Sequence, residues 1–471
     1  MTEFWERFCF YGMRWALTLY IMSAFYAHSP AGEKEANHLF GAYSGLIYAS
    51  SFFGGYIADR VIGYQSAILL GAFLLAIGQF FIPISSHMYF LVGLACTVVG
   101  SGLFKPNIST ILGKVYAESD PRRDRGFTIF YMGINAGSLI SPILTGWLAQ
   151  SVFGTPEAEN YKVVFIVSGI GMLISLVWFW LGKKQLKHVG LPPQGNTKRR
   201  FLLVLIGALA LVPVIYYMLI ALSTTAQTVF LTALFIASAA IIIKVGYTDG
   251  KVQLHRVYAM LSIFVFNILF WTFFEQAGSS FNFLALNNVD RSFGGWEIPV
   301  AWFQSINPIA ILVFAPCITI IWSALYKRGW EPIIPAKFAF GLLFNSAAFL
   351  LLMYALRYCV NFQHKIPSWP LVGVYLLQTV GELCLSPIGL SMVTKLSPGR
   401  LAGLAMGAWF LSIAIAENLA GIFAGIVSGN DGMTISAALQ GYKFGFVSLL
   451  LAGLLLLALS PFIKKWMHGI N

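Results

Sequence analysis

The sequence predicts an all-α membrane protein with about fourteen transmembrane helices, and three observations support this class. Of the 471 residues, 58% are hydrophobic and only 10% are charged, whereas a soluble domain is about 25% charged. The chain contains many apolar runs long enough to span a bilayer, which takes about 20 helical residues. It lacks the repeating, alternating pattern of a membrane barrel. In lipid this leaves helices, because they satisfy their own backbone polar groups.

Fourteen apolar segments define the expected spans, and polar loops containing Pro or Gly separate them. The longest charged connection, 183–200, follows the sixth span. The first span begins directly after Met1, so we expect a few residues to precede it in the natural protein. In chain order the segments are 4–27, 40–58, 64–85, 88–113, 127–153, 163–182, 201–222, 226–243, 257–286, 298–325, 338–356, 368–394, 401–428 and 441–463.

The basic residues predict the orientation of the chain. If both termini are cytoplasmic, the inside loops carry 21 of the 30 Lys and Arg residues and the outside loops carry 6, while Arg7, Arg14 and Lys105 lie within spans. This bias agrees with the positive-inside rule. It also explains the net charge of +12 without nucleic acid as a partner. We therefore expect a multi-pass protein of the cell inner (plasma) membrane with both termini in the cytoplasm.

The arrangement of the spans predicts two halves. Spans 201–222 and 226–243 contain no charged residue, and removing them leaves six helices in each half. Twelve core transmembrane helices in two six-helix bundles are the plan of the major facilitator superfamily, in which each half contains two three-helix repeats. We expect an N-terminal bundle at 1–183, a cytoplasmic linker with the two extra helices at 184–250, and a C-terminal bundle at 251–471.

One short motif agrees with this superfamily. Gly55, Asp59, Arg60 and Gly63 form a Gly-x-x-x-Asp-Arg-x-x-Gly pattern directly after the second span. The pattern resembles the superfamily's conserved loop between helices 2 and 3. The alternative interpretation is a Gly-rich turn with a charge pair at a helix end.

Eight ionisable residues lie within or at the edge of the predicted spans. At a helix centre, Asp, Lys and Arg each cost about 2.5–3.5 kcal/mol on insertion scales, so eight such groups in lipid would cost on the order of 20 kcal/mol. They must face one another or a wet cavity, and such residues usually mark substrate pathways or proton relays. A role in helix packing alone is the alternative, although buried pairs seldom add net stability. The eight are Glu3, Glu6, Arg7, Arg14, Lys105, Glu275, Glu382 and Glu417.

Their positions are regular. Without the inserted pair, all except Glu417 fall on helices 1, 4, 7 and 10, the first helices of the four repeats. At about 100° per residue, the polar groups of the first helix fall in one sector of about 140°. This predicts a polar stripe that faces inward. Three cations meet four or five anions, so one carboxylate can take up a proton or await a cationic ligand. The stripe comprises Glu3, Glu6, Arg7, Tyr11 and Arg14.

Six motifs resemble the proton-dependent oligopeptide transporter (POT) family. The resemblance covers the whole chain, and bacterial members of that family also insert two helices between the halves. One departure is Phe10, which stands where many members have a second tyrosine. The motifs are Glu3–Arg14 (EFWERFCFYGMR), Phe104–Asn107 (FKPN), Phe130–Gly137 (FYMGINAG), Phe270–Gln276 (FWTFFEQ), Phe303–Pro308 (FQSINP) and Gly381–Pro387 (GELCLSP).

The resemblance implies proton-coupled symport of di- and tripeptides into the cell by alternating access. Arg14 and Lys105 would hold the peptide carboxylate, and Glu382, in the opposite half, would receive the ammonium group. Other side chains would contact peptide amides or form aromatic walls, although periodicity alone would make most of the wall residues ordinary core. These further substrate-binding positions are Tyr11, Tyr48, Asn135, Trp271, Asn307, Ser386 and Trp409.

The resemblance also implies that Glu3, Glu6, Arg7, Lys105 and Glu275 couple transport to protons. Protonation of Glu275 would release Lys105 from a salt bridge between the halves. We expect no cofactor, because each imported proton brings about 2.3 kcal/mol per 100 mV. We expect no metal site, since no pair of the five cysteines has metal-site spacing. The expected state is a monomer in membrane lipid.

Three other function classes stay open. The chain could carry a different substrate, such as nitrate or a drug, although groups for both peptide ends argue against a simple anion carrier. An intramembrane enzyme would need a catalytic pattern, and the sequence offers no His pair on one helix and no Ser-containing elbow. A channel would need a continuous pore, which bulky charged groups at the midplane oppose.

Overall fold

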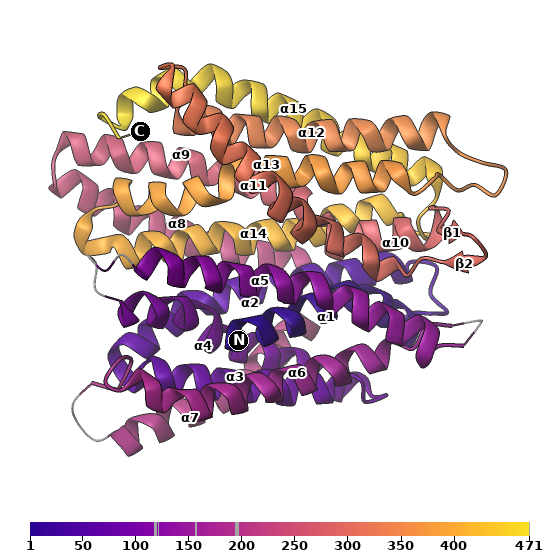
Figure 1. Cartoon of the computed structure of the whole chain (residues 1–471), viewed down its shortest axis with the longest axis horizontal. Coiled ribbons are helices and arrows are strands. Elements are labelled where there is room, and N and C mark those ends of the chain that lie inside the picture. Colours follow the sequence, from indigo (N-terminus) through magenta and orange to yellow (C-terminus); the bar gives the residue numbers. More distant parts are fainter. Residues whose placement is uncertain (117–119, 121, 156–157, 194–196, 471) are drawn as a thin grey trace. The chain divides into compact units, whose positions relative to one another are not determined.

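The computed structural model describes residues 1–116, 120, 122–155, 158–193 and 197–470 (Figure 1). The described residues form fourteen helices of at least 18 residues, which confirms the predicted all-α class and number of long helices. These helices are α1 (Thr2–Phe25), α2 (Gly32–Ile57), α3 (Tyr64–Phe81), α4 (His87–Val115), α5 (Arg122–Trp147), α6 (Tyr161–Gly182), α7 (Thr197–Ala221), α8 (Thr224–Thr248), α9 (Lys251–Phe274), α11 (Ile306–Lys327), α12 (Ile334–Tyr358), α13 (Trp369–Leu396), α14 (Ala402–Ser428) and α15 (Ile435–Trp466).

Within the described residues, twelve of these helices are long and apolar enough to cross a membrane. The other two are α1 and α2. Charged residues lower their apolarity, because α1 carries the predicted polar stripe and α2 opens with Glu33, Lys34 and Glu35. Among the twelve spans, α11, α7 and α8 are the least buried, at 11%, 17% and 22% of their apolar windows. Most of their side chains are therefore available to lipid.

The chain divides into two compact units. Unit 1 comprises 1–27 and 42–227, and unit 2 comprises 28–41 and 228–471. This division falls within α2 and within the first turn of α8. The predicted boundaries of the two bundles and of the insert at 184–250 rest on hydropathy and stay a prediction.

Close backbone approaches hold the helices of unit 1 together. A Cβ added to Gly71 on α3 would lie 2.7 Å from the carbonyl oxygen of Gly100 on α4, and a Cβ on Gly100 would lie 2.8 Å from that of Gly71. On α2, a Cβ at Gly54 would overlap the carbonyl oxygen of Gly102 on α4. Helices in lipid associate through such small-residue contacts, because no hydrophobic effect drives them together.

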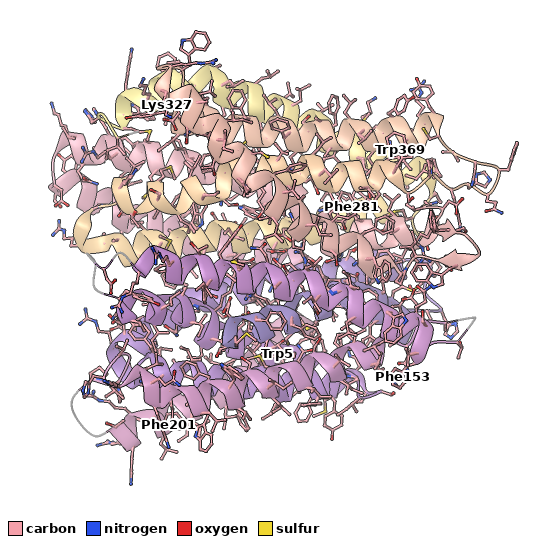
Figure 2. The ribbon with its side chains drawn as sticks, in the orientation of Figure 1. Trp5, Phe153, Phe201, Phe281, Lys327 and Trp369 are labelled. Atoms are coloured by element: carbon pink, nitrogen blue, oxygen red, sulfur yellow. The ribbon has the colours of Figure 1, made fainter. Side chains whose placement is uncertain are left out.

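Aromatic packing and one glycine contact stabilise unit 2. Phe281, Phe349 and Tyr442 are each at most 1% exposed. The Tyr442 ring lies 5.9 Å from that of Phe281 and 5.6 Å from that of Phe349, and Figure 2 labels Phe281. The first part of α2 also packs here, because Gly41 lies so near Gly421 of α14 that a Cβ would approach its Cα to 2.6 Å.

The second helix begins eight residues earlier than the predicted segment 40–58. Glu33 in its first turn is only 6% exposed. Its carboxylate accepts hydrogen bonds from Asn287 Nδ2 at 2.7 Å and from the backbone N–H of Met433 at 2.9 Å. The predicted boundary was wrong because polar residues were treated as loop, whereas here they are satisfied inside unit 2.

The predicted span 257–286 is not one continuous helix. After α9 the chain forms a 3-10 turn at Glu275–Gly278, breaks at Ser279 (φ −131°, ψ −100°) and resumes as α10 (Ser280–Asn287). An antiparallel hairpin follows, in which β1 (Ser292–Phe293) pairs with β2 (Trp296–Glu297). Gly294 and Gly295 have positive φ angles of 58° and 84°, which suit this tight turn. The hairpin was not predicted from the sequence.

The loop motif at 55–63 has a defined geometry. Asp59 accepts a hydrogen bond from the Tyr64 hydroxyl at 2.7 Å, and Lys114 Nζ lies 3.5 Å from the same carboxylate. The bond from Tyr64 and the nearby Lys114 lower the pKa of Asp59. Gly63 has φ +77°, and a Cβ there would lie 2.5 Å from the nitrogen of Pro192. Only glycine fits at position 63, so this end of the motif has a fixed backbone conformation.

Candidate transport site

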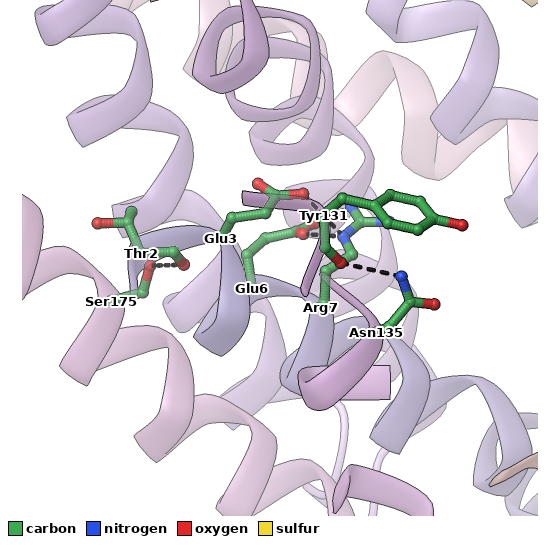
Figure 3. A network of polar contacts seen from close by, with 7 residues as sticks. All are labelled: Thr2, Glu3, Glu6, Arg7, Tyr131, Asn135 and Ser175. Atoms are coloured by element: carbon green, nitrogen blue, oxygen red, sulfur yellow. Dashed lines mark hydrogen bonds and ion pairs between the residues drawn. The ribbon is translucent and has the colours of Figure 1, made fainter. Parts of the chain in front are cut away.

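The polar stripe of α1 forms a buried charge cluster in unit 1 (Figure 3). Arg7 Nε lies 3.2 Å from Glu3 Oε1, and the Arg7 guanidinium binds both carboxylate oxygens of Glu6, at 2.5 and 2.7 Å. The three residues are between 2% and 8% exposed. Glu3 Oε2 is buried without a hydrogen-bond partner. One guanidinium thus pairs with two carboxylates.

Small residues on α5 and α6 fix the position of α1. The Ser175 hydroxyl donates to the carbonyl oxygen of Thr2 at 2.9 Å, and the Ser141 hydroxyl donates to that of Phe8 at 2.5 Å. A Cβ on Gly12 would lie 2.5 Å from Ser141 Oγ. Gly12, which follows the Glu-x-x-Glu-Arg-Phe motif, therefore helps to position that motif, because it lets α1 approach α5 closely.

Aromatic rings surround the predicted carboxylate-binding cations. Lys105 Nζ lies 3.8 Å from the Tyr48 ring centroid and 5.7 Å from that of Phe10. The Phe10 ring also lies 5.2 Å from the Arg7 guanidinium. Phe10 lacks a hydroxyl that a tyrosine would bring, but its ring contacts two cations through their attraction to the π face.

The other three predicted binding residues of unit 1 are Arg14, Tyr11 and Asn135. Arg14 and Tyr11 are half-buried, and the Arg14 guanidinium lies 5.9 Å from the Tyr11 ring centroid. Asn135 on α5 is 3% exposed and donates to the carbonyl oxygen of Tyr131 at 2.9 Å (Figure 3). The amide nitrogen of Asn135 is therefore bonded within its own helix, and its role toward a substrate stays a prediction.

In unit 2, Asn307 orients Glu382. Asn307 Nδ2 donates to Glu382 Oε2 at 2.9 Å and to Thr379 Oγ1 at 3.0 Å. Thr379, Glu382 and Ser386 are three and four residues apart on α13, which places them on one helix face. Ser386 Oγ is buried without a hydrogen-bond partner. These residues form a polar, half-buried site with a fixed carboxylate.

The two predicted tryptophans differ in their surroundings. Trp271 is half-buried, and its indole N–H donates to Asn267 Oδ1 at 3.0 Å. Trp409 is only 3% exposed, with its ring centroid 5.4 Å from that of Phe264. A Cβ on Gly389 would clash with Cη2 of Trp409, so the glycine makes room for the indole. In this structure Trp409 is a core residue of unit 2, and its role as a substrate wall stays a prediction.

The two remaining intramembrane carboxylates are buried in unit 2. Glu275 is 5% exposed and begins the 3-10 turn that interrupts the helix after α9. Its neighbour Gln276 donates to the carbonyl oxygen of Ala420 on α14 at 3.2 Å, which fixes this turn. Glu417 on α14 is 4% exposed. None of the eight intramembrane ionisable residues is exposed, as the cost of charge in lipid requires.

A family model described as "PTR2: POT family" matches residues 65–438. The chain belongs to this family. Dipeptide and tripeptide permease A of Escherichia coli (strain K12) is 34% identical over 439 residues, which cover 92% of this chain and 84% of the permease. The permease of the same name from Yersinia pestis is 34% identical over 470 residues, covering 97% and 90%.

A solved structure agrees with these relatives. A POT family transporter in complex with a thioalcohol conjugated peptide superimposes with a TM-score of 0.81 and 32% identity, covering 98% of this chain and 95% of that one. The chain is therefore a multi-pass POT family peptide transporter. Its relatives are transporters rather than enzymes.

This POT transporter has a small cavity beside the charge cluster of α1. The cavity has a volume of about 10 Å³ and is lined by Glu6, Tyr43, Gln79 and Thr97, among others. Tyr43 and Thr97 bond to each other at 2.9 Å, and Gln79 Oε1 is buried without a hydrogen-bond partner. The volume suits about one water molecule at most. Glu6 thus borders a small space that polar and apolar side chains line together.

Two charged residues of the POT transporter were missed by sequence reasoning. Glu33 and Lys337 were assigned to loops, but they lie in the first turns of α2 and α12 and are 6% and 8% exposed. Pro335 was an available signal for Lys337, because proline is favoured in the first turn of a helix. No comparable signal marks Glu33, since its partners Asn287 and Met433 are distant in the sequence.

Proposed function

We propose that this POT transporter imports di- and tripeptides together with protons by alternating access. The relatives named dipeptide and tripeptide permease support the substrate class, as does the solved relative with a bound peptide conjugate. The observation that carries the proposal is a pair of opposite charges: cations on aromatic rings in unit 1, and a carboxylate held by an amide in unit 2.

These charges match the two ends of a peptide. In the proposal, Arg14 offers a planar fork and Lys105 a point charge to the peptide carboxylate. Glu382 accepts the peptide ammonium, and the bond from Asn307 keeps its carboxylate in place. Tyr11, Tyr48 and Trp271 provide ring surfaces that tolerate different side chains. A peptide drives alternating access to the extent that it binds one state of the transporter better than the other.

Proton coupling is assigned to the buried carboxylates. Glu3 and Glu6 share the Arg7 guanidinium, so one proton can neutralise the cluster without leaving a buried cation unpaired. Glu275 and Lys105 complete the proposed relay, in which protonation of Glu275 frees Lys105 for the peptide carboxylate. The proton gradient supplies the energy, and the proposal includes no cofactor. The bias of basic residues supports an inner-membrane protein with cytoplasmic termini, and we propose that it acts as a monomer.

Uptake of labelled dialanine into proteoliposomes tests the proposed function. We expect accumulation only with an inward proton gradient, competition by other di- and tripeptides, and no competition by free alanine. Gradient-independent equilibration would contradict proton coupling. Failure to take up dialanine in vesicles with correctly folded protein would contradict the substrate class.

The role of Glu382 is tested by Glu382→Gln, which keeps the size of the side chain but removes its charge. Without an anion for the peptide ammonium, we expect dialanine binding to fall by roughly 100-fold, since truncating a buried charge partner costs about 2–5 kcal/mol. Glu297→Gln is the matched control, because this carboxylate lies in the outer hairpin and pairs with Arg291. Normal dialanine binding by Glu382→Gln would refute the assignment.

The role of Glu275 is tested by Glu275→Gln, which mimics the protonated acid. We expect this variant to retain peptide counterflow, because exchange needs no net proton movement. It should lose gradient-driven accumulation, because the charge that responds to the proton is absent. Concentration of peptide to the wild-type level would show that Glu275 has no part in coupling.

A further inference from the structure

A chain of hydrogen bonds connects α9 and α14 inside unit 2. The indole N–H of Trp271 donates to Asn267 Oδ1 at 3.0 Å, and Asn267 Nδ2 donates to Ser412 Oγ at 2.9 Å. The Ser412 hydroxyl in turn donates to the carbonyl oxygen of Trp409 at 2.6 Å. Trp271 and Asn267 lie four residues apart on α9, which places them on one face of that helix. The proposed function assigns no role to Asn267 or Ser412.

The bonds of this chain all run in one direction, which fixes the orientation of the Asn267 amide. A primary amide has an acceptor oxygen on one side and a donor nitrogen on the other, whereas an indole can only donate. The amide oxygen must therefore face Trp271, because the reversed amide would place two donors against each other. Ser412 thus orients Asn267, and Asn267 orients Trp271.

Packing alone does not require polar groups at this contact between helices. Asn267 and Ser412 are both 0% exposed. Hydrogen bonds between membrane helices add little stability on average. Two apolar side chains of the same shape can replace such a pair with little loss. The bond from Asn267 to Trp271 is therefore the better explanation of the buried pair.

The same bond determines which part of Trp271 can meet a ligand. Trp271 is half-buried, and its ring packs edge to face against Phe274, with centroids 5.1 Å apart and an interplanar angle of 77°. The ring is thus held by Phe274 and by Asn267. The N–H is the single polar group of an indole, and here it is bonded to Asn267. Trp271 can therefore offer a ligand only carbon surface.

We propose that Asn267 is a positioning residue that selects for peptides with apolar side chains. It fixes the indole of Trp271 and occupies its N–H, so the wall of the peptide site is an aromatic surface without a hydrogen-bond donor. A polar side chain against this wall loses hydration without a bond in return, which is unfavourable, whereas an apolar side chain gains from burial. The selectivity rests on the proposed function, in which Trp271 lines the peptide site.

Competition between two dipeptides of similar shape tests this selectivity. Alanyl-leucine and alanyl-asparagine are used to inhibit uptake of labelled dialanine into proteoliposomes, and the ratio of their inhibition constants is measured. We expect the wild type to bind alanyl-leucine more tightly. In Asn267→Leu the indole N–H loses its acceptor and can donate to the polar side chain of alanyl-asparagine. The preference for alanyl-leucine should then fall about fivefold, which is the effect of a single hydrogen bond.

The same substitution in a Trp271→Phe background separates positioning from packing. Phenylalanine keeps a ring but has no N–H, so Asn267 has no indole donor to accept from. We expect Asn267→Leu to leave the ratio of Trp271→Phe unchanged, which is the coupling that a double-mutant cycle detects. Asn37→Leu is the matched control, because Asn37 is also 0% exposed and donates to a serine of α14, Ser428, at 3.0 Å. Its ratio should equal that of the wild type.

Asn267→Ser is a second variant in case Asn267→Leu does not fold. A serine within a helix can bond to a carbonyl oxygen of the preceding turn, so its hydroxyl does not stay unsatisfied. Because its side chain is shorter than that of asparagine, it should release the indole of Trp271. The same fall in the preference for alanyl-leucine is expected.

Three results would overturn the proposal. The first is a wild type without any preference for alanyl-leucine. The second is an unchanged ratio in the Asn267 variants that still take up dialanine. The third is an equal fall of the ratio with and without Trp271→Phe, because Asn267 would then act through packing. Failure of the proposed function is recognised separately, since wild-type vesicles would then take up no dialanine and the role of Asn267 would be refuted with it.

Discussion

At the scale of single residues, Arg7 has the largest energetic consequence in the charge cluster. It binds Glu3 and Glu6, and all three side chains are buried. Removing one partner of a buried ion pair costs about 3–5 kcal/mol, because the remaining charge is left uncompensated. We expect Arg7→Leu to lower the Tm of the purified transporter by several degrees, measured by fluorescence during heating.

The control for this prediction is Arg60→Leu. Arg60 Nε lies 3.8 Å from Asp59 Oδ2, and the two side chains are 72% and 51% exposed. Exposed pairs contribute about 1 kcal/mol or less, so Tm should change little. Equal Tm losses in the two variants would show that the buried ion pairs of Arg7 stabilise the protein no more than the exposed pair of Arg60.

Sequence reasoning at this scale succeeded where partners lie on one helix. The spacing of Glu3, Glu6 and Arg7 predicted an inward stripe, because helical periodicity fixes which residues share a face. It failed for Lys337, whose burial depends on Trp322 and Glu331. It also gave an incomplete account of Phe10, where it predicted a missing hydroxyl but not a ring in contact with two cations. Contacts between helices are not encoded in local spacing.

At the scale of helices, glycine contacts predict which packing interfaces tolerate a side chain. A Cβ on Gly54 would overlap the carbonyl oxygen of Gly102, so Gly54→Ala must force α2 and α4 apart. Overpacking of this kind costs about 1–3 kcal/mol. We expect a lower Tm and lower yield of folded protein, measured by size-exclusion chromatography and thermal unfolding.

Gly207→Ala on α7 is the matched control. Nothing lies within 4 Å of the position that its Cβ would take. Alanine is favoured over glycine in a helix by about 1 kcal/mol, so Tm should stay the same or rise slightly. A neutral Gly54→Ala variant would mean that α2 and α4 separate easily.

Hydropathy predicted the helices but not the irregular places that position polar groups. The segment 257–286 is apolar enough on average to be predicted as one span, yet the helix is interrupted at Glu275–Ser279. Apolar content predicts the length of the segment that spans the membrane. A break in the helix depends instead on backbone angles and on hydrogen bonds such as that from Gln276 to the carbonyl oxygen of Ala420. The early start of α2 was missed because a polar residue such as Glu33 favours a loop prediction, whereas its side chain is buried in the folded protein.

At the scale of the whole molecule, composition predicted the number of long helices because bilayer thickness sets a common length for every span. The division into compact units could not be predicted in the same way. Residues 28–41 belong to unit 2 although most of α2 belongs to unit 1. That assignment depends on contacts such as Gly41 with Gly421, which are far apart in the sequence.

Helix α12 provides a test of orientation. Its 25 residues span about 37 Å at 1.5 Å per residue, which exceeds the hydrocarbon core of about 30 Å. Arg328 precedes it within a basic segment, and Phe362 follows it in a loop where its side chain is fully exposed. The positive-inside rule therefore places Arg328 in the cytoplasm and Phe362 outside.

The measurement uses single cysteines, Arg328→Cys or Phe362→Cys, in a variant whose five native cysteines are replaced by serine or alanine. A membrane-impermeant maleimide should label Cys at 362 in spheroplasts and Cys at 328 only in inverted vesicles. The reverse pattern would invert the predicted orientation. Labelling of both from one side would contradict a membrane-spanning α12, because its two ends would then share an aqueous compartment.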